Sequence, residues 1–366
     1  MNMKQMKLLK SSLLTMAVSM ALLSSLTSCS PSEPGTRWTE QQAREWYSRQ
    51  GWLSGCDYIP ATAINQIEMW SKDTYDEAQI DKELTWAEDL GFKTLRVYLS
   101  SVVYQNDPSG MKKRMGQFLD VCRKHGIRPL FVFFDDCWNE ESQYGQQPQP
   151  KPGIHNSGWV QDPSVSVRKD TAAMYASLEK YVRDIVKTFG QDDRILLWDL
   201  YNEPGNSGHL TSSLPLLRKA FEWARAERPT QPLTAGLWNW ADEYAPLNAL
   251  QIENSDVISY HNYGDSLNHR TMIKYLTMLN RPLVCTEYMA RTQNSTFQTI
   301  LPMLKEKNVV AINWGFVQGK TNTIYQWSTP IPDGSEPALW FHDILRPDGT
   351  PYIQNEVNVI RALNGK

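Results

Sequence analysis

Two periods of apolar and polar residues alternate along this chain, and they predict strands and helices in regular succession. Short apolar runs typical of buried strands occur eight times and end near 55–56, 98–99, 133–134, 200, 236–237, 259–260, 286 and 314. Stretches with apolar residues three or four positions apart lie between them and predict helices over 81–90, 111–125, 172–189, 215–227, 270–279 and 297–305. A weaker helical pattern, 246–251, follows the fifth strand. Because strands that alternate with helices form parallel sheets, the pattern predicts eight parallel strands.

Glycine follows three of the long predicted helices. Gly91, Gly126 and Gly190 each come directly after a helical stretch, and we expect each to adopt the left-handed conformation that ends a helix. No internal repeat with a fixed period of roughly 20 to 50 residues is evident, which argues against a solenoid. Eight strand and helix units of this kind predict a single (β/α)8 barrel, the TIM-barrel fold.

Two of the predicted loops are much longer than the others. They cover 135–170, after the third strand, and 315–337, after the eighth, and both are polar and rich in Trp, Pro and Gly. In a parallel barrel both would leave from the carboxyl-terminal rim, where barrel enzymes have their active sites. Long rim loops with aromatic residues usually shape a binding cleft, so we expect one here.

The first 28 residues have the pattern of an export signal. Three lysines precede an apolar run over 13–26, which is too short for a comfortable membrane span. The sequence Leu-Thr-Ser-Cys at 26–29 resembles a bacterial lipobox, in which Cys29 would be lipidated. An ordinary signal with an incidental cysteine is the alternative. We expect a signal peptide over 1–28, a tether over 29–40 and the barrel domain over 41–366, in a lipoprotein on the periplasmic or cell-surface face of the outer membrane.

Composition and charge narrow the possible partners. The chain is 41% hydrophobic, enough for a full core, and its formal net charge of −3 becomes more negative once the three signal-peptide lysines are removed. A mildly acidic body argues against nucleic acid, and contact with a membrane would come only through the lipid. We expect a monomer. Cys56, Cys122, Cys137 and Cys285 could form disulfides in an oxidising compartment, which the sequence cannot pair, but buried free thiols are favoured because Cys122 lies in a helical pattern and Cys285 in a strand. No CxxC or HExxH spacing indicates a metal site or another cofactor.

Two predicted strands end in glutamate. The run Trp-Asp-Leu-Tyr-Asn-Glu-Pro over 198–204 ends in Glu203, and Leu-Val-Cys-Thr-Glu-Tyr over 283–288 contains Glu287. In one parallel barrel both carboxylates would lie at the same rim. Two facing carboxylates are the minimum apparatus for cleaving a glycosidic bond, so the sequence predicts a glycoside hydrolase.

These motifs resemble the retaining β-glycoside hydrolases of clan A, and most of all the cellulase and mannanase family, glycoside hydrolase family 5. The resemblance covers residues 51–352. It implies that Asn202 and Glu203 end strand four, with Glu203 as acid/base, and that Glu287 ends strand seven as nucleophile of a double displacement on a β-linked glycan. One departure is that the family commonly has a histidine after strand three, where this chain has Phe134-Asp135-Asp136.

Several other residues are expected to support this pair. Arg96 lies inside an apolar strand and needs an anionic partner, for which the resemblance implies Glu287 and general pairing rules leave Glu88 as an alternative. His261 and Tyr263 share one face of strand six, where the resemblance implies contacts with the nucleophile or with a sugar hydroxyl.

The resemblance also implies two direct contacts with the sugar. Trp314 at the end of strand eight would stack on the pyranose, with core packing as the alternative, and Asn202 would bind the 2-hydroxyl. Other candidates are nominated by rim position alone, with simple solvation as the alternative: Asp57, Tyr58, Asp135, Asp136, Trp138, Asn156, Trp159, Trp238 and Asn239.

The preferred function is a retaining glycosidase whose partner is a carbohydrate substrate. The alternative from another class is a surface glycan-binding lipoprotein that keeps the barrel without turnover. Phosphate-dependent barrel chemistry is disfavoured, because no glycine-rich phosphate loop follows strands seven and eight. The sugar that is recognised, and endo or exo action, depend on loop contacts that the sequence leaves open.

Overall fold

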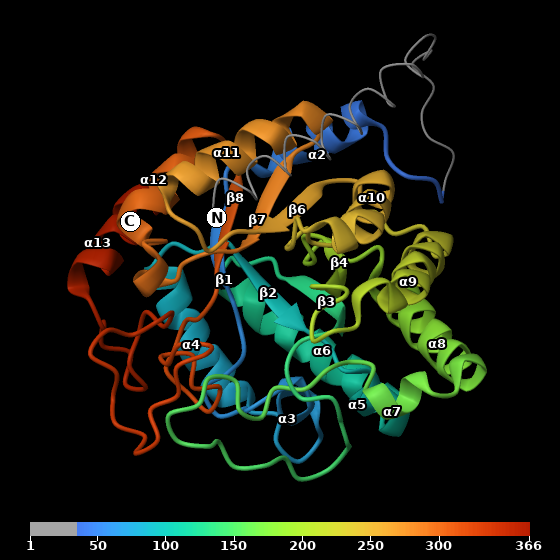
Figure 1. Cartoon of the computed structure of the whole chain (residues 1–366), viewed down its shortest axis with the longest axis horizontal. Coiled ribbons are helices and arrows are strands. Elements are labelled where there is room, and N and C mark those ends of the chain that lie inside the picture. Colours follow the sequence, from blue (N-terminus) through green and yellow to red (C-terminus); the bar gives the residue numbers. More distant parts are fainter. Residues whose placement is uncertain (1–34) are drawn as a thin grey trace.

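Eight parallel strands form the centre of the structure, a computed structural model that describes residues 35–366 (Figure 1). They are β1 (Ser54–Asp57), β2 (Thr94–Tyr98), β3 (Leu130–Asp135), β4 (Trp198–Asn202), β5 (Leu233–Thr234), β6 (Ile258–His261), β7 (Leu283–Glu287) and β8 (Val310–Asn313). Their order in the sheet is β5-β4-β3-β2-β1-β8-β7-β6. A single parallel bridge between Leu237 and Tyr260 joins the two outer strands, so the sheet closes into the predicted (β/α)8 TIM barrel.

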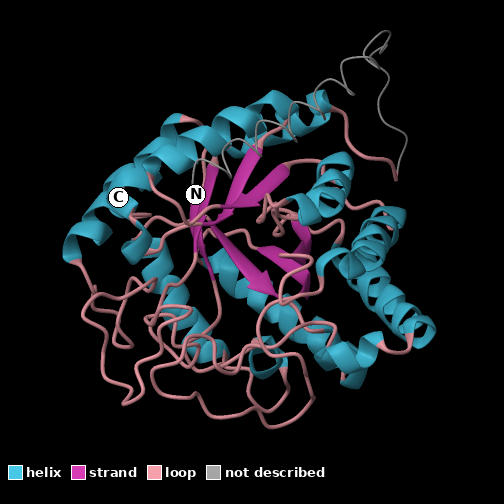
Figure 2. Cartoon of the chain, viewed as in Figure 1, coloured by secondary structure: helices cyan, strands magenta, loops and turns pink. Residues whose placement is uncertain are grey.

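Helices surround the strands on the outside (Figure 2). They are α2 (Glu40–Gln50), α3 (Gln66–Trp70), α4 (Glu77–Asp89), α5 (Ser101–Asn106), α6 (Pro108–Lys124), α7 (Val165–Arg168), α8 (Thr171–Phe189), α9 (Leu214–Ala226), α10 (Ala245–Asn254), α11 (Ser266–Leu276), α12 (Phe297–Glu306) and α13 (Gln354–Asn364). Every helix expected from the apolar periodicity is present, and the weak pattern over 246–251 corresponds to α10. The apolar faces of these helices pack on the strands and form the main core.

Helix α2 closes the amino-terminal end of the barrel. Trp46 and Tyr47 on this helix pack against residues at the base of the barrel, including Leu197 and Val284. Just before α2, Arg37 donates hydrogen bonds to the backbone oxygens of residues 252 and 255, at 2.7 and 2.9 Å. The described end of the predicted tether is therefore packed on the barrel. The signal peptide over 1–28 and the lipidation site Cys29 lie outside the described residues.

The fifth strand is shorter than its sequence predicts. The apolar run extends to 236–237, but the ladder with β4 ends at Thr234. The carbonyl of Gly236 accepts a hydrogen bond of 2.6 Å from the side-chain amide of Gln251 on α10. The amide of Gln251 thus occupies a carbonyl oxygen that would otherwise accept a hydrogen bond from a neighbouring strand. The chain rejoins the sheet only at Leu237, which forms the bridge to Tyr260.

Two of the three predicted glycine caps are confirmed and one is wrong. Gly91 and Gly126 have φ of 76° and 65°, the left-handed region that favours glycine. Gly190 has φ of −67°, which any residue can adopt. A β-carbon at this position would lie 2.5 Å from the oxygen of Val186 and 3.3 Å from the α-carbon of Pro229. Gly190 is therefore required by close packing, which local sequence does not indicate.

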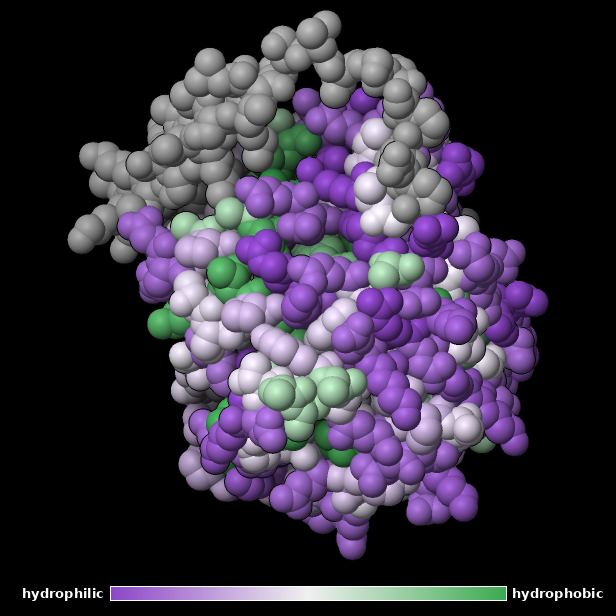
Figure 3. Space-filling view, turned by 90° about the vertical axis from the view of Figure 1, so that its right-hand side faces the viewer, coloured by the Kyte–Doolittle hydropathy of each residue, from purple (hydrophilic) through white to green (hydrophobic). Residues whose placement is uncertain are grey.

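Three further features concern the cysteines, the surface and the length of the helices. The cysteines of the described chain, Cys56, Cys122, Cys137 and Cys285, are free and buried, as predicted. The face drawn in Figure 3 is mostly polar, with its apolar residues in small separate groups. Within residues 35–366 no helix is both long and apolar enough to cross a membrane.

Candidate active site

A cleft of about 840 Å³ opens at the carboxyl-terminal rim of the barrel. Glu203 and Glu287 both line it, together with His261 at the end of β6, Tyr263 just after it, and Trp314 directly after β8. The sheet places them there because parallel strands end at the same rim, so residues at strand ends meet although they lie far apart in the sequence.

Strand register explains the closest pairs in the site. Glu287 is the last residue of β7 and lies beside His261, the last residue of β6. In the same way Arg96 pairs with Asp57 across β1 and β2, and Asn202 pairs with Asp135 across β3 and β4. Each polar side chain therefore meets a neighbour from the adjacent strand.

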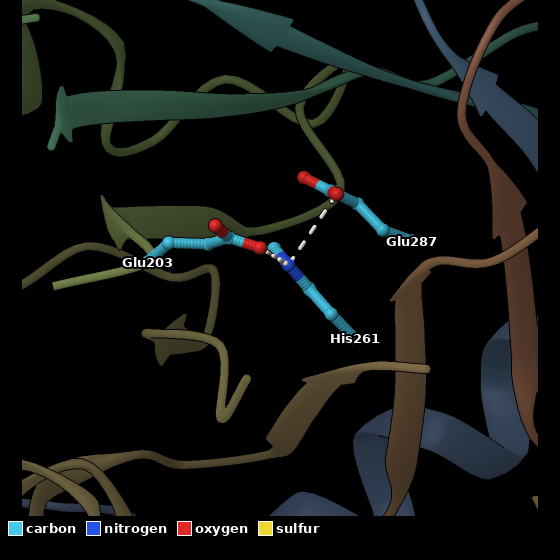
Figure 4. A group of neighbouring side chains, drawn as sticks. All are labelled: Glu203, His261 and Glu287. Atoms are coloured by element: carbon cyan, nitrogen blue, oxygen red, sulfur yellow. Dashed lines mark hydrogen bonds and ion pairs between the residues drawn. The ribbon is translucent and has the colours of Figure 1, made fainter. Parts of the chain in front are cut away.

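Glu203, His261 and Glu287 form the centre of the site (Figure 4). The Nδ1 atom of His261 lies 2.8 Å from Oε1 of Glu203 and 3.4 Å from Oε2 of Glu287. An oxygen of one carboxylate lies within 4.8 Å of an oxygen of the other. Glu203 follows β4 directly and has φ of 44°, a left-handed backbone conformation at the point where the chain turns into the rim. The two carboxylates thus face each other across one imidazole.

Arg96 holds several anions below this centre. Its Nη1 atom lies 2.7 Å from Glu287 and 2.9 Å from Asp57, and its Nε atom lies 2.9 Å from Asp199. Its Nη2 atom donates to the Oδ1 of Asn202 at 2.7 Å. One guanidinium faces three buried carboxylates, and burial, the largest effect, raises the pKa of all three above its ordinary value despite the guanidinium. The alternative partner Glu88 lies elsewhere, next to the ring of His125.

The two glutamates have different surroundings. Glu287 touches the guanidinium of Arg96 and accepts hydrogen bonds from the hydroxyls of Tyr263 and Tyr98, at 2.7 and 3.3 Å. These donors and the positive charge favour its ionised form and act against the burial that raises its pKa.

Glu203 has only uncharged partners in direct contact. It accepts from the thiol of Cys137 at 3.3 Å and from the amide of Asn206 at 2.5 Å. Burial raises the pKa of Glu203, and these two hydrogen bonds lower it by less. Since burial also lowers the pKa of His261 to about 4, the imidazole is neutral near pH 7 and adds no charge beside Glu203.

An aromatic group forms one side of the cleft. Trp314 packs edge-on against Trp159 and Tyr98, with ring centres 5.8 and 6.1 Å away. The indole nitrogen of Trp159 donates to Asp135 at 2.7 Å, and the amide of Asn202 donates to the other oxygen of Asp135 at 2.9 Å. Asp135 is thus a buried support that fixes both Trp159 and Asn202, and burial raises its pKa to about 6.

The other rim candidates divide into two groups. Trp138, Asn156 and Trp238 line the cleft. Asp57 does not: it lies at the end of β1 under Arg96, as a partner of that guanidinium.

Three further candidates have structural contacts instead of positions in the cleft. The hydroxyl of Tyr58 donates to the buried Glu83 of α4 at 2.8 Å. Asp136 forms an ion pair with Arg168, and the side chain of Asn239 accepts from the backbone of residue 241. Rim position in the sequence therefore overpredicts substrate contacts, because alternate residues point outward into the helix layer.

Sequence reasoning missed several residues of the site. Asp199 is a charged residue between two apolar neighbours in β4, and Tyr98 lies two positions after Arg96 on the same face of β2. Strand alternation could therefore have found both. The loop residues Cys137, Asn206 and His155 carried no such signal. They line the cleft because of the path of their loops.

Among the described residues, Glu203, His261 and Glu287 are also the group whose ligand atoms could hold a metal ion. The imidazole already bridges the two carboxylates, and the guanidinium of Arg96 supplies a positive charge 2.7 Å from Glu287. Because these three side chains already contact one another, we interpret them as a hydrogen-bonded group of two carboxyls and one imidazole.

Comparisons with known proteins agree with this geometry. Residues 57–319 match the family model for cellulase, glycosyl hydrolase family 5. An exo-β-1,4-mannosidase from Opitutaceae bacterium strain TAV5 is 20% identical with a TM-score of 0.59, over 86% of this chain and 60% of that longer chain. An endo-1,4-β-mannanase from Thermotoga petrophila is 14% identical with a TM-score of 0.54, over 86% and 99%. A family 5 mannosidase from Rhizomucor miehei is 14% identical with a TM-score of 0.54, over 86% and 92%. No curated protein matches by sequence. At these identities the structural likeness shows a shared fold.

Proposed function

Because this chain belongs to the cellulase family, glycosyl hydrolase family 5, we propose that it hydrolyses β-linked oligo- or polysaccharides by double displacement. The family makes it an O-glycosyl hydrolase that retains the anomeric configuration. The observation that carries the proposal for this chain is the separation of the carboxylates, with oxygens of Glu203 and Glu287 within 4.8 Å. The carboxyl groups of retaining enzymes are about 5 to 5.5 Å apart, and those of inverting enzymes about 6.5 to 9.5 Å. An approach this close between single oxygens of the two carboxylates supports the shorter, retaining separation.

In the first step Glu287 attacks the anomeric carbon and Glu203 protonates the glycosidic oxygen. Glu287 suits the attack because Arg96 and Tyr263 stabilise its ionised form. Glu203 suits the acid role because burial raises its pKa and no cation touches it. The glycosidic bond breaks, the leaving sugar takes the proton of Glu203, and a glycosyl ester of Glu287 forms.

In the second step Glu203, now ionised, takes a proton from water as the water attacks the same carbon. The ester bond to Glu287 breaks and the sugar leaves with its original configuration. His261 is a positioning residue in both steps, since its neutral ring holds the two carboxyl groups at a fixed separation. The amide of Asn202 donates to Asp135 and, weakly at 3.4 Å, to the sulfur of Cys137, and a sugar 2-hydroxyl could take the place of that sulfur. Trp314 provides a flat face for the sugar ring.

We propose β-mannosides and β-glucosides as the first substrates to test. Support comes from the cellulase name of the family and from the mannanase and mannosidase titles of the structural neighbours. Specificity between these sugars depends on single hydroxyl contacts, which a panel of aryl β-glycosides and β-1,4-oligosaccharides would separate.

Replacement of the proposed nucleophile tests the function. Glu287→Gln keeps the size of the side chain but removes the attacking oxygen charge, so kcat should fall on the order of 10⁴-fold while sugar binding persists. The matched control is Glu306→Gln on the exposed end of α12, which should keep wild-type kcat. Hydrolysis rates and calorimetric binding would be measured for both variants, and proton NMR would follow the anomer released by the wild type.

Each outcome has a distinct meaning. Initial release of the β-anomer and loss of turnover in Glu287→Gln support the proposal. A wild-type protein that binds oligosaccharides but cleaves no glycan of the panel would favour the glycan-binding alternative. Glu203→Ala would identify the acid, because aryl glycosides with an activated leaving group need little protonation and should suffer much less than oligosaccharides.

We also propose that the chain is an exported lipoprotein attached to a bacterial outer membrane through Cys29. The support is the signal-like pattern over 1–28 and the lipobox-like end at 26–29.

A further inference from the structure

The two long rim loops are joined to each other on one side of the cleft. The backbone nitrogen of Asn156 donates to the oxygen of Thr321 at 2.8 Å, and that of Ile331 donates to Gly153 at 3.0 Å. The side chain of Asn322 donates to the backbone oxygens of residues 151 and 154, at 2.9 and 3.2 Å. We call residues 151–159 and 319–334 together the loop wall. In Figure 1 these segments, in green and orange-red, run along the same side of the barrel.

The loop wall stands on the side of Glu287. Its Trp159 packs edge-on against Trp314 at 5.8 Å, and its Trp327 packs edge-on against Tyr263 at 4.8 Å. Tyr263 in turn donates to Glu287 at 2.7 Å. The wall therefore begins directly behind the aromatic floor and the proposed nucleophile.

The side of Glu203 is open by comparison. Asn206, Trp238 and Trp240 line the cleft there and are partly exposed, and Ser207 is exposed. On the wall, Lys151, Ile154 and Trp327 are exposed at its edge, but His155 and Asn156 are only 2% and 1% exposed and lie beneath the joined loops. No such pair of hydrogen-bonded long loops stands on the Glu203 side among the described residues, so we infer that a glycan chain continues past Glu203 and stops at the wall.

The chemistry of the reaction sets the direction of the glycan. The sugar attacked by Glu287 keeps its anomeric carbon and lies on Trp314, while the leaving part of the chain lies at the acid Glu203. The leaving part is on the reducing side of the cleaved bond. The wall consequently faces the non-reducing end of the substrate.

Polar groups of the wall are placed to bind that end. Both amide atoms of Asn156 are buried and make no hydrogen bond within residues 35–366, although the side chain lines the cleft. The Nδ1 atom of His155 is paired with the oxygen of Tyr325 at 2.8 Å, and its buried Nε2 atom has no partner among the same residues. Buried polar atoms without partners cost free energy, and sugar hydroxyls would satisfy them.

We propose that this enzyme acts from the non-reducing end of a β-linked glycan and releases single sugars, with Asn156 and His155 binding hydroxyls of the terminal residue. The inference rests on the proposed hydrolase function and adds the position of cleavage. It assigns the loop wall as the feature that excludes internal sites of a polysaccharide.

A chain-end assay with the wild-type protein tests the position of cleavage. The substrate is a β-1,4-linked pentasaccharide of the sugar preferred in the aryl-glycoside panel, labelled with a fluorophore at its reducing end. We expect the first products to be free monosaccharide and labelled tetrasaccharide. The same pentasaccharide with a 4,6-O-benzylidene group on its non-reducing terminal sugar should not be cleaved.

The failures of the two proposals differ. Labelled mono-, di- or trisaccharide at the earliest times, or cleavage of the blocked chain, would overturn the exo inference while leaving the hydrolase function intact. Absence of turnover on every aryl glycoside and oligosaccharide would count against the hydrolase function itself, and the inference would fall with it.

Two asparagine variants test the wall. Asn156→Gly fits the local φ of 47° and removes the amide, so kcat/KM for the pentasaccharide should fall about 10- to 100-fold. Asn308→Gly is the matched control, since Asn308 is exposed, has φ of 52° and lies far from the cleft before β8. Asn322→Gly removes two bonds between the loops and should allow some cleavage of the blocked chain. Unchanged kcat/KM in Asn156→Gly, with an unfolding curve like that of the control, would overturn its role.

Discussion

The two glutamates of the site, for which we propose opposite tasks, differ most in one neighbour. The guanidinium of Arg96 touches Glu287, whereas Glu203 touches a thiol, an amide and a neutral imidazole. Burial raises the pKa of both carboxyls, but the positive charge opposes this effect most strongly where it is in contact. The proposed acid and the proposed nucleophile are therefore distinguished by their contacts, and not by residue type.

The thiol of Cys137 offers a test of this balance. It donates to Glu203 and thereby lowers the pKa of that carboxyl, so Cys137→Ala should raise the pKa. A general acid works only while protonated, so the decline of kcat/KM at high pH should move to higher pH, by up to about one unit for a lost hydrogen bond.

The pH profile of kcat/KM on an oligosaccharide would measure this shift. Cys137→Ser keeps a donor and should stay close to wild type. Cys122→Ala, which changes a buried thiol on α6 remote from the cleft, should leave the profile in place. A movement toward lower pH in Cys137→Ala would contradict the assigned hydrogen bond.

At the scale of elements, the barrel fixes the site through strand register and leaves access to the loops. Adjacent strand ends bring His261 to Glu287 and Asn202 to Asp135 without any contribution from the loops. In our proposal, the loops after β3 and β8 then determine how much of a glycan can enter. The rigid strands thus position the reacting groups, and the more variable loops select the substrate.

Two glycines show how packing between elements sets tolerance to substitution. Gly190→Ala would place a β-carbon 2.5 Å from the oxygen of Val186 and against Pro229, so it should lower the free energy of unfolding by about 1 to 3 kcal/mol. Gly116 lies inside α6 with no atom within 4 Å of a β-carbon. Gly116→Ala should raise the free energy of unfolding by about 0.4 to 1 kcal/mol, because alanine favours a helix.

Urea unfolding followed by circular dichroism would measure both variants. Both variants replace glycine with alanine, so opposite changes in the free energy of unfolding would show the effect of the space around each β-carbon. A stabilised Gly190→Ala protein would mean that the approach of Pro229 is less close than the structure has it.

At the scale of the whole molecule, the barrel has two ends with different contacts. The chain enters the structure at the amino-terminal end, where Arg37 bonds the backbone before β6 and α2 covers the base. The cleft lies at the opposite end. A lipid attached upstream of Arg37 would therefore leave the cleft accessible to glycans.

Cys29→Ser tests the proposed anchor. Lipidation needs the thiol, so the variant should move from the membrane fraction to the soluble fraction. Its kcat/KM should equal that of the wild type, because Glu203 and Glu287 are unchanged and the cleft lies at the end of the barrel opposite to Arg37. Ser32→Ala is the control that keeps the cysteine, and a Cys29→Ser protein that stays in the membrane fraction would contradict the anchor.

The sequence by itself determined the strands, the helices between them and the meeting of Glu203 with Glu287. These depend on local periodicity and on one topological rule, that parallel strands end at one rim. It also determined that Arg96 needs an anion, since a buried cation is costly anywhere in a protein.

Only the tertiary structure decided which carboxylates contact the guanidinium of Arg96 and why a glycine is needed at position 190. It also decided which loops join to form the wall at one side of the cleft. Asp199 joins Arg96 from a different strand, and Thr321 meets Asn156 from a loop 165 positions further along the chain. Such contacts depend on the path of each segment through space. Local patterns of apolar and polar residues carry no information about that path, so the fold and the two acids could be predicted and the shape of the pocket could not.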